Sequence, residues 1–176
     1  MVQKTILEYG VNVMVIEADQ IWLADISPII STAFSTQQVQ IVAGDERSAV
    51  LGEERRHICG GFYGISSKAL SIFSRYVETH FTNMRQYENT TGIIPLIDDQ
   101  ALLTSFMTAS NLSIFWFQKC EYASGQWYSS AKYRKACPYP TVLHNNYIVG
   151  NSAKKNRAKA RRHWFFDESR RKCTAS

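Results

Sequence analysis

The chain has 176 residues and a mass of 20.1 kDa, which is the size of one domain. Hydrophobic residues make up 45% of it and charged residues 20%, a balance typical of a globular protein with a buried core. This composition excludes a wholly disordered chain, a collagen-like polymer and a small disulfide-rich scaffold. The net charge of +5 is concentrated at one end, because residues 150–176 carry nine basic and two acidic side chains and the rest of the chain has a net charge of −2.

The cysteines are spread along the chain without a C-x-x-C pair, which excludes the spacings of zinc fingers and thioredoxin-like motifs: Cys59, Cys120, Cys137 and Cys173. Three pairings into two disulfides remain open, as do buried thiols. Two N-glycosylation sequons begin at Asn89 and Asn111 and are consistent with a secretory location. The longest uncharged run, residues 100–118, holds eight Gln, Thr, Ser and Asn residues and is too polar for a lipid-facing span.

The first predicted elements are a helix over residues 2–9, which ends at Gly10, and a strand over residues 11–16. The strand is an apolar run rich in β-branched residues, a pattern typical of strands buried on both faces. A helix that leads into such a strand through one glycine forms the second half of an α/β unit. Because the strand that would precede this helix is not in the sequence, we expect an N-terminal portion of the domain to be missing.

The rest of the chain continues to alternate between predicted helices and strands, so the expected fold class is α/β. In chain order we expect a short helix or turn over 29–34, strands over 39–42 and within 57–66, a helix from Ser66 or Ser67 to about Phe81, a helix from Asp98 or Asp99 to about Ser110, a strand over 112–117, a loop over 122–135, an apolar stretch over 142–149 that ends at Gly150, and a basic helix from Asn151 or Ser152 to about His163.

Glu17 and Asp19 follow the strand over residues 11–16. Side chains alternate along a strand, so these two carboxylates are expected to point the same way. They repel each other unless a cation lies between them, and Mg²⁺ or Mn²⁺ prefers such oxygen ligands. The carboxyl ends of parallel strands are also where open α/β sheets bind ligands. Two solvated loop acids would account for the same pattern.

A second candidate site starts at His144 and Asn145 and continues with Gly150, Lys154 and Lys155. An imidazole nitrogen binds divalent metals. The two lysines lie at the predicted start of the last helix, where the helix dipole also favours phosphate. These residues indicate a metal ligand beside an anion site, whereas a histidine that only makes structural hydrogen bonds is the simpler alternative.

Asp98, Asp99 and Gln100 open the predicted helix in the middle of the chain. One aspartate at the N-cap satisfies backbone amides that have no partner within the helix, so capping explains one of the two acids. The other aspartate and Gln100 are then candidate substrate contacts.

In this order, the segments resemble the nucleotide-diphospho-sugar transferases, a GT-A-type glycosyltransferase family that includes the rhamnogalacturonan xylosyltransferases. The family signature is a strand that ends in Asp-x-Asp, followed by Trp-Leu and Asp-Pro. The matching positions here are Glu17-Ala18-Asp19, Trp22-Leu23 and Asp25 with Pro28 displaced by two residues; Gly61-Phe62-Tyr63 before a helix; Asp99-Gln100 before Leu102 and Leu103; and the late group His144, Asn145, Gly150, Lys154 or Lys155, Trp164 and Asp167.

The resemblance implies a GT-A-like, Rossmann-type mixed sheet flanked by helices, in a single and apparently truncated domain over residues 1–167 that is followed by a basic tail over 168–176. It implies a retaining glycosyltransferase that moves a sugar from a nucleotide-diphosphate donor, a UDP-sugar, to a glycan or glycoprotein acceptor. Mn²⁺, or Mg²⁺, is the implied cofactor. It also implies a place in the Golgi lumen, with any membrane anchor outside this sequence and no nucleic acid as a partner.

The resemblance also assigns roles to individual residues. A divalent ion with cations nearby neutralises the charge that develops on a nucleoside diphosphate leaving group. The assigned residues are the metal ligands Asp19 and His144; Glu17, in contact with the metal or the ribose; the donor and diphosphate contacts Asn145, Gly150, Lys154 and Lys155; and the candidate catalytic residues on the sugar and acceptor side, Asp99 and Gln100.

The chain departs from the family pattern in two ways. Glu17 replaces the first aspartate, and its extra methylene moves the carboxylate by about 1.5 Å, a shift that costs on the order of 100-fold where geometry is tight. The chain also begins ten residues before the Asp-x-Asp strand, whereas GT-A proteins bind the base and ribose mainly on earlier elements. We therefore expect these residues alone to bind UDP-sugars weakly and to leave one edge of the sheet uncovered.

Two alternatives come from other classes of function. A catalytically inactive, transferase-like module would bind sugars without turnover, and Glu17 is the feature that favours it. A nucleic-acid-binding domain would use the basic C-terminal helix and would bind with a steep salt dependence. The Ala-Lys-Ala-Arg-Arg pattern of that helix also fits a solvated helix face.

Overall fold

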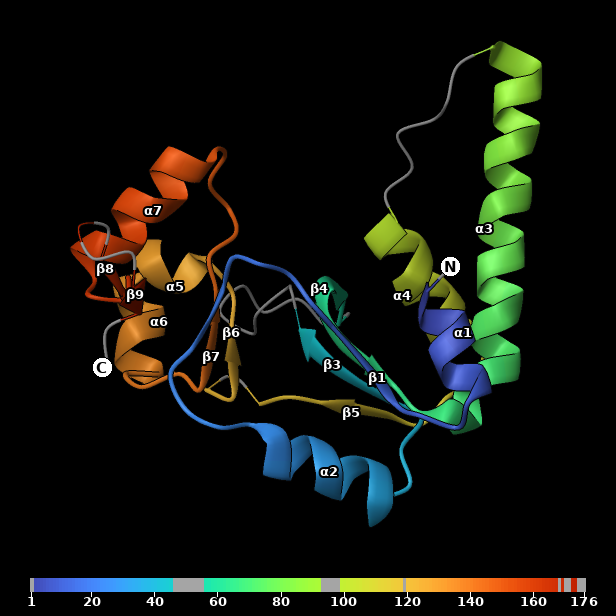
Figure 1. Cartoon of the computed structure of the whole chain (residues 1–176), viewed down its shortest axis with the longest axis horizontal. Helices are drawn as coiled ribbons and strands as arrows, with labels where there is room; N and C mark the ends of the chain where they lie inside the picture. The colour runs from blue at the N-terminus through green and yellow to red at the C-terminus, as the bar shows by residue number, and fades with distance from the viewer. Residues whose placement is uncertain are drawn as a thin grey trace.

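The computed structural model describes residues 2–45, 56–92, 99–118, 120–167, 169 and 172–173. Helices and strands alternate along the chain, which confirms the α/β class expected from the sequence (Figure 1). The elements are α1 (Val2–Glu8), β1 (Val13–Ile16), β2 (Gln20–Trp22), α2 (Ser27–Ser35), β3 (Ile41–Asp45), β4 (Ile58–Ile65), the 3₁₀ turn η1 (Ser67–Ala69), α3 (Leu70–Thr91), α4 (Asp99–Ala109), β5 (Ile114–Trp116), β6 (Tyr122–Ala123), α5 (Gln126–Ser129), α6 (Ala131–Ala136), β7 (Val142–His144), α7 (Asn151–Ala160), β8 (Phe166–Asp167) and β9 (Lys172–Cys173).

The main sheet has the strand order β1-β4-β3-β5 and is mixed. Strand β4 runs antiparallel to both β1 and β3, and β5 runs parallel to β3. Strands β1, β3 and β5 therefore share one direction, and their carboxyl ends lie at the same edge of the sheet. This edge is where α/β sheets of this kind place their ligands.

Strand β1 is less buried than its sequence predicts. Ile16 is 46% exposed, and Met14 and Val15 are partly buried. The expectation of burial on both faces was wrong because β1 lies at the end of the strand order, with β4 as its one neighbour among the described strands. Its apolar side chains pack on the sheet without being enclosed.

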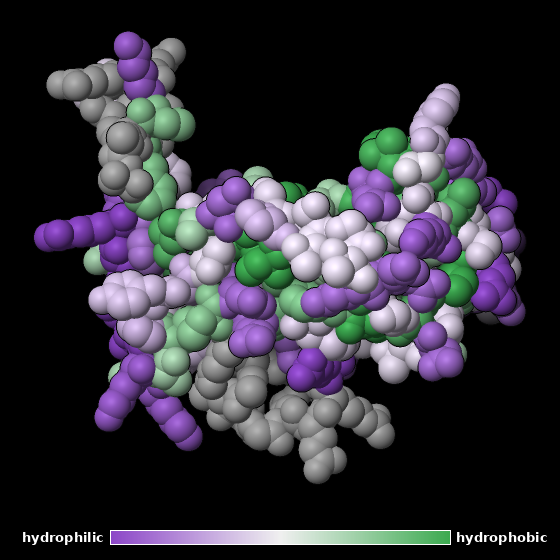
Figure 2. Space-filling view, turned by 90° about the horizontal axis from the view of Figure 1, so that it is seen from below, coloured by the Kyte–Doolittle hydropathy of each residue, from purple (hydrophilic) through white to green (hydrophobic). Residues whose placement is uncertain are grey.

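Helices cover both faces of the main sheet (Figure 1). Helices α1, α3 and α4 bury one core with residues such as Leu7, Phe73 and Met107. Helix α2 lies on the opposite face, over a second core that includes Phe34 and Phe62. On the side of the molecule that carries α2, hydrophobic and hydrophilic residues are interspersed, as is usual for a globular surface (Figure 2).

Helix α3 extends ten residues beyond the end predicted at Phe81 and closes at Gly92, which has a φ of +70°. Its first half packs on the sheet through buried side chains including Tyr76, whereas residues 85–92 are exposed. The apolar periodicity stops where the packing stops, so it marks the buried half of the helix and not its end. The helix rises well beyond the sheet (Figure 1). In the part of the chain that the structure describes, no helix combines the length and apolar character needed to span a membrane.

A second sheet, with the order β2-β7-β6, was not expected. The loop predicted over residues 122–135 was wrong, because this stretch forms β6, α5 and α6. A disulfide between Cys120 and Cys137 joins its ends, and Trp127 and Tyr133 form part of a small core between them. Cys59 and Cys173 are thiols. The cysteines therefore form one disulfide, whereas the sequence left open two disulfides in three pairings or buried thiols.

The apolar stretch predicted over residues 142–149 is a strand in its first three residues, which form β7. The chain then turns through Tyr147, with a φ of +57°, to Gly150, with a φ of +92°, where α7 begins as predicted. Helix α7 ends three residues before the predicted end. Asp98 and most of the predicted basic tail over 168–176 lie outside the described residues.

Candidate functional site

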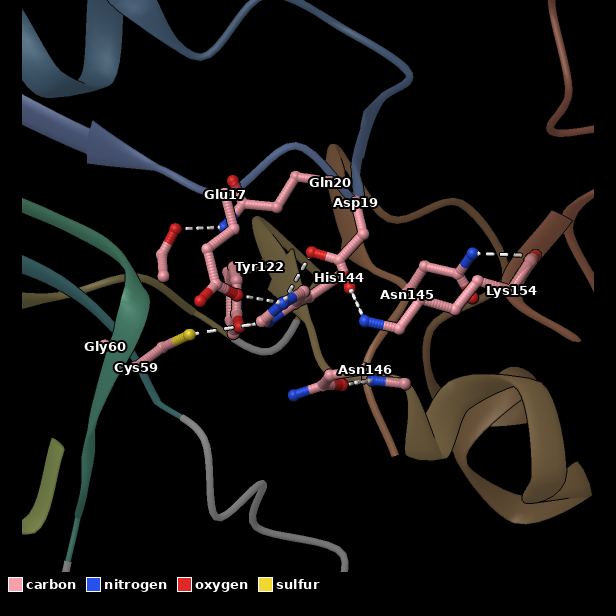
Figure 3. Close-up of polar contacts among 12 residues, drawn as sticks. Glu17, Asp19, Gln20, Cys59, Gly60, Tyr122, His144, Asn145, Asn146 and Lys154 are labelled. Carbon is pink, nitrogen blue, oxygen red and sulfur yellow. Dashed lines mark hydrogen bonds and ion pairs between the residues drawn. The ribbon is translucent and has the colours of Figure 1, made fainter. Parts of the chain in front are cut away.

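Three side chains from two distant parts of the sequence converge at the edge of the sheet: Glu17, Asp19 and His144 (Figure 3). The Nε2 atom of His144 lies 3.0 Å from Oε2 of Glu17 and 3.1 Å from Oδ1 of Asp19. We call these three residues the acid–histidine cluster. The residue patterns alone placed them in two separate candidate sites, which only the family resemblance joined, and the fold brings the two sites together.

The two acids reach the cluster from a turn and not from a strand. Strand β1 ends at Ile16, and the backbone N–H of Gln20 donates to the carbonyl of Glu17 at 3.3 Å. The alternation of strand side chains therefore gave the right outcome for the wrong reason. The pairing of β2 with β7 places Gln20 opposite His144, which fixes the turn beside the imidazole.

Glu17 occupies space that a glycine of β4 leaves open. A Cβ atom at Gly61 would overlap the carboxyl group of Glu17, and the N–H of Glu17 donates to the carbonyl of Gly61 at 2.9 Å. Cys59 and Phe62 lie in the same core although they are three residues apart, so the alternation of β4 is interrupted between them. The absence of a side chain at Gly61 leaves room for the Glu17 carboxyl group, and Glu17 reaches His144 despite its extra methylene.

Asp19 is held by three groups. Its Oδ1 faces His144, its Oδ2 accepts from Nζ of Lys154 at 2.7 Å, and its carbonyl accepts from the N–H of Asn145 at 3.0 Å. Partial burial acts to raise the pKa of Asp19, but the hydrogen bond from Lys154 and the charges of Lys154 and His144 outweigh it and hold the pKa below its ordinary value. Asp19 is therefore an anion whose Oδ1 points into the cluster.

His144 is the buried member of the cluster, with 3% of its surface exposed. Its Nε2 faces the two acids, and its Nδ1 faces the protein interior. There it lies 2.9 Å from the hydroxyl of Tyr122 and 3.4 Å from Sγ of Cys59. Both ring nitrogens therefore have defined neighbours (Figure 3).

The donor set fits a hard divalent ion. One imidazole nitrogen and two carboxylate oxygens lie within 4.8 Å of one another. Separations of 3.0 and 3.1 Å between ligand atoms match those of neighbouring ligands around an octahedral ion with bonds of about 2.1 Å. The same separations fit hydrogen bonds from a protonated Nε2, so the cluster is able to hold either an ion or a proton.

The residues of α7 differ in what they contact. Nζ of Lys155 lies 5.7 Å from the ring centre of Trp164, while Lys154 binds Asp19. The side-chain amide of Asn145 donates to the carbonyl of Lys154 and accepts from Nε of Arg157, so it joins the end of β7 to α7. Gly150 precedes α7 in a conformation that favours glycine and has open space around it.

Gln100 contacts the sheet beside the cluster. Its Oε1 accepts from the N–H of Gly60 at 2.9 Å, and Gly60 follows Cys59, whose sulfur contacts His144. Gln100 therefore reaches the cluster through the backbone of β4. Asp99 is the first residue of α4, and its side chain lies outside the described part of the structure.

A cavity of about 880 Å³ opens beside the cluster, a volume in the range of small-molecule sites. Acidic, basic and aromatic side chains line it, among them Glu17, Asp19, Lys154, Lys155, Trp22 and Trp164. Tyr122, Cys59 and Gly61 were not singled out as functional residues by the sequence analysis. Gly61 carried a signal, because two consecutive glycines within a predicted strand indicate a bulge or a close approach. Tyr122 lies in the stretch that the sequence predicts to be a loop.

The fold is that of a GT-A-like glycosyltransferase. The crystal structure of the apo form of the glycosyltransferase GlyE of Streptococcus pneumoniae TIGR4 matches 95% of this chain with a TM-score of 0.51 and 14% sequence identity, and the match covers 43% of that chain. Another crystal structure of GlyE matches 92% of this chain, with a TM-score of 0.47 and 14% identity, over 46% of its own length. The chain thus spans less than half the length of these structures.

The family is established by sequence. The profile of the nucleotide-diphospho-sugar transferases matches residues 1–158, so the chain belongs to the nucleotide-diphospho-sugar transferase family. This confirms the resemblance to that family. No curated protein matches the sequence.

Proposed function

We propose that the protein binds the metal ion and the diphosphate of a nucleotide-sugar donor, a UDP-sugar, in a metal-dependent glycosyltransferase reaction that retains anomeric configuration. The observation that carries this proposal is the acid–histidine cluster with Lys154 beside it at the wall of the cavity. Asp19, His144 and Glu17 would hold Mn²⁺ or Mg²⁺. When bound, such an ion supplies positive charge that stabilises a departing nucleoside diphosphate.

Helix α7 supplies further positive charge on the same side of the cavity. Lys154 and Lys155 lie in its first turns and line the cavity, and the N-terminal end of a helix favours anions. Lys154 contacts Asp19, so its positive charge would lie beside a bound ion and would help to hold the diphosphate. Asn145 and Arg157 keep α7 in this place.

The aromatic lining of the cavity suits a sugar ring. Trp22 and Trp164 both line it, and 38% and 37% of their surfaces are exposed. Exposed aromatic faces combine apolar contact area with a polar N–H. A glycan or glycoprotein acceptor would enter on this side.

A role of Asp99 and Gln100 on the sugar and acceptor side is part of the same proposal. Gln100 would contribute by holding the backbone of β4 at Gly60.

A Golgi location belongs to the same proposal. Disulfides persist in oxidising compartments, and Cys120 and Cys137 form one. Asn89 and Asn111, which begin the two sequons, are exposed. Expression in a eukaryotic secretory pathway is expected to give a protein whose mass falls on treatment with an N-glycosidase; an unchanged mass would remove this support.

Donor binding tests the proposed function most broadly. We expect millimolar UDP-sugar to bind only when Mn²⁺ is present, and Lys154→Gln to weaken this binding about tenfold by removing one charge-assisted contact, measured by calorimetry. Lys159→Gln, on an exposed position of the same helix, is the matched control and is expected to bind as the wild type does.

The outcomes separate the classes of function. Mn²⁺-dependent binding with release of UDP supports a transferase, and binding without release identifies an inactive binding module. Equal binding with and without Mn²⁺ would contradict the proposed role of the cluster. Tight binding to DNA or RNA with a steep salt dependence would instead favour the nucleic-acid alternative.

A further inference from the structure

We propose that Tyr122 is a positioning residue for the metal site: its hydroxyl oxygen accepts a hydrogen bond from Nδ1 of His144 and thereby presents Nε2 of His144 to the ion. The proposal rests on the proposed function, since it assumes that the acid–histidine cluster binds a divalent ion. It adds a residue that touches neither the ion nor the substrate.

The chemistry of imidazole requires such a partner. A neutral imidazole carries its proton on one of its two nitrogens, and a nitrogen that binds a metal has none. With the ion on Nε2, the proton is on Nδ1, which must then donate to an acceptor inside the protein. The hydroxyl of Tyr122 lies 2.9 Å from Nδ1, a normal hydrogen-bond distance.

Cys59 is the other neighbour of Nδ1 and is the weaker acceptor. Its sulfur lies 3.4 Å from the nitrogen, and a thiol sulfur accepts hydrogen bonds poorly. The oxygen of Tyr122 therefore decides which nitrogen carries the proton. Cys59 fills the space beside it.

The ring of Tyr122 is fixed in place. It is 2% exposed, and it stacks on Phe62 with the ring centres 5.0 Å apart and the planes 9° apart. On β3, a Cβ atom at Gly44 would lie 2.8 Å from the ring, so the glycine there allows the ring to approach the backbone. The parallel pairing of β6 with β7 sets Tyr122 opposite Val142, two residues before His144, which places the hydroxyl beside the imidazole.

The substitution Tyr122→Phe removes the hydroxyl and keeps the ring. We expect it to weaken Mn²⁺ binding by about 10–100-fold, the range found when a partner of a metal-bound histidine is lost, while the thermal stability without Mn²⁺ changes little. Calorimetric titration with MnCl₂ measures the affinity. Equal affinities of the variant and the wild type would overturn the proposal.

Tyr128→Phe is the matched control. The hydroxyl of Tyr128 also lies beside a histidine nitrogen, 3.1 Å from Nδ1 of His163, but neither residue belongs to the acid–histidine cluster. We expect the control to bind Mn²⁺ with wild-type affinity. An equal loss in both variants would show a general packing effect and would overturn the proposal.

A second measurement uses the wild-type protein alone, so it does not depend on whether a variant folds. The ¹⁵N chemical shifts of the His144 ring in wild-type protein saturated with Mg²⁺ report which nitrogen carries the proton; we expect Nδ1, and a proton on Nε2 would overturn the proposal. A wild type that binds neither ion would contradict the proposed metal site itself. Wild-type binding with an unaffected Tyr122→Phe variant would contradict only the role of Tyr122.

Discussion

The molecule has two regions that are built differently. The first, which we call the sheet region, comprises the main sheet with α1 to α4 and has apolar cores on both faces. The second, which we call the short-element region, runs from residue 120 to residue 160 and is held by a disulfide, a small core and polar contacts such as those of Asn145. Each region supplies part of one site, so the site forms only when the short-element region packs against the sheet region.

The acid–histidine cluster lies where the two regions meet (Figure 3). Glu17 and Asp19 follow a strand of the sheet region, whereas His144 and Lys154 come from the short-element region. Phe62 belongs to the sheet region, and its ring stacks on that of Tyr122 across the boundary. The geometry of the cluster therefore depends on how the short-element region is held against the sheet.

Removal of the disulfide is expected to have the largest effect, because it loosens the short-element region and leaves the sheet region intact. Replacing both Cys120 and Cys137 by Ala opens a loop that spans 17 residues, and we expect the free energy of unfolding to fall by about 3 kcal/mol. Urea unfolding measures this change. Because the loop includes Tyr122 and leads into β7, Mn²⁺ affinity is expected to fall as well.

Cys173→Ala is the control for loss of a cysteine, because Cys173 is an exposed thiol. It is expected to leave both the stability and the Mn²⁺ affinity near the wild-type values. A double variant that keeps wild-type Mn²⁺ affinity would show that the cluster does not depend on the disulfide.

A smaller and more local effect is expected at Gly61. In Gly61→Ala, the new methyl group takes the space of the Glu17 carboxyl group, so Glu17 must move away from His144. We expect Mn²⁺ affinity to fall by about tenfold, at the low end of effects on metal sites, and calorimetry measures it. The loss should match that of Glu17→Gln, and the double variant should show no added loss.

Gly64→Ala on the same strand separates the metal effect from disturbance of the sheet. A Cβ atom at Gly64 would overlap the sulfur of Met14 and crowd Val42, away from the cluster. This control is expected to lower the melting temperature and keep wild-type Mn²⁺ affinity. A pattern in which both glycine variants bind Mn²⁺ equally well would contradict the role given to Gly61.

The smallest effect is expected from His163, which packs on Trp127 and Tyr128. Burial, with a contribution from Arg161, lowers the pKa of His163 in the folded state. The unfolded chain therefore binds this proton more readily, so the stability that His163 confers is present above its unfolded pKa of about 6.5 and is lost as the pH falls through the lower folded value. Melting temperatures between pH 8 and pH 5 are expected to fall less for His163→Gln than for the wild type; an equal fall would contradict this.

The sequence predicted the sheet region better than the short-element region, for a physical reason. Strand β4 and helix α3 match predicted elements, because both are long enough for their buried apolar side chains to form a pattern in the sequence. Residues 122–135 form elements of two to six residues, which are too short to show a period. Their structure depends on the disulfide and on rings such as Trp127, which no local pattern reveals.

The same reason explains which parts of the candidate site were found. Glu17 and Asp19 were singled out by residue type and by their place after a predicted strand, and His144 by residue type and by the amides, glycine and lysines that follow it. Tyr122 was not, because its role follows from the parallel pairing of β6 with β7, a contact between segments that the sequence does not display. The family resemblance supplied the link between the two candidate sites that the residues alone left separate.

The central claim is that the acid–histidine cluster binds a divalent ion through Asp19. Thermal unfolding of the wild type, Asp19→Asn and Asp25→Asn, with and without MnCl₂, tests it most directly. Asp25 is an exposed acid whose Oδ1 accepts from the N–H of Ser27, the first residue of α2. At an Mn²⁺ concentration of 100 times Kd, binding stabilises by about 2.7 kcal/mol, which corresponds to several degrees in Tm. We predict this rise for the wild type and Asp25→Asn and none for Asp19→Asn. An equal rise in all three proteins, or no rise in the wild type, would contradict the claim.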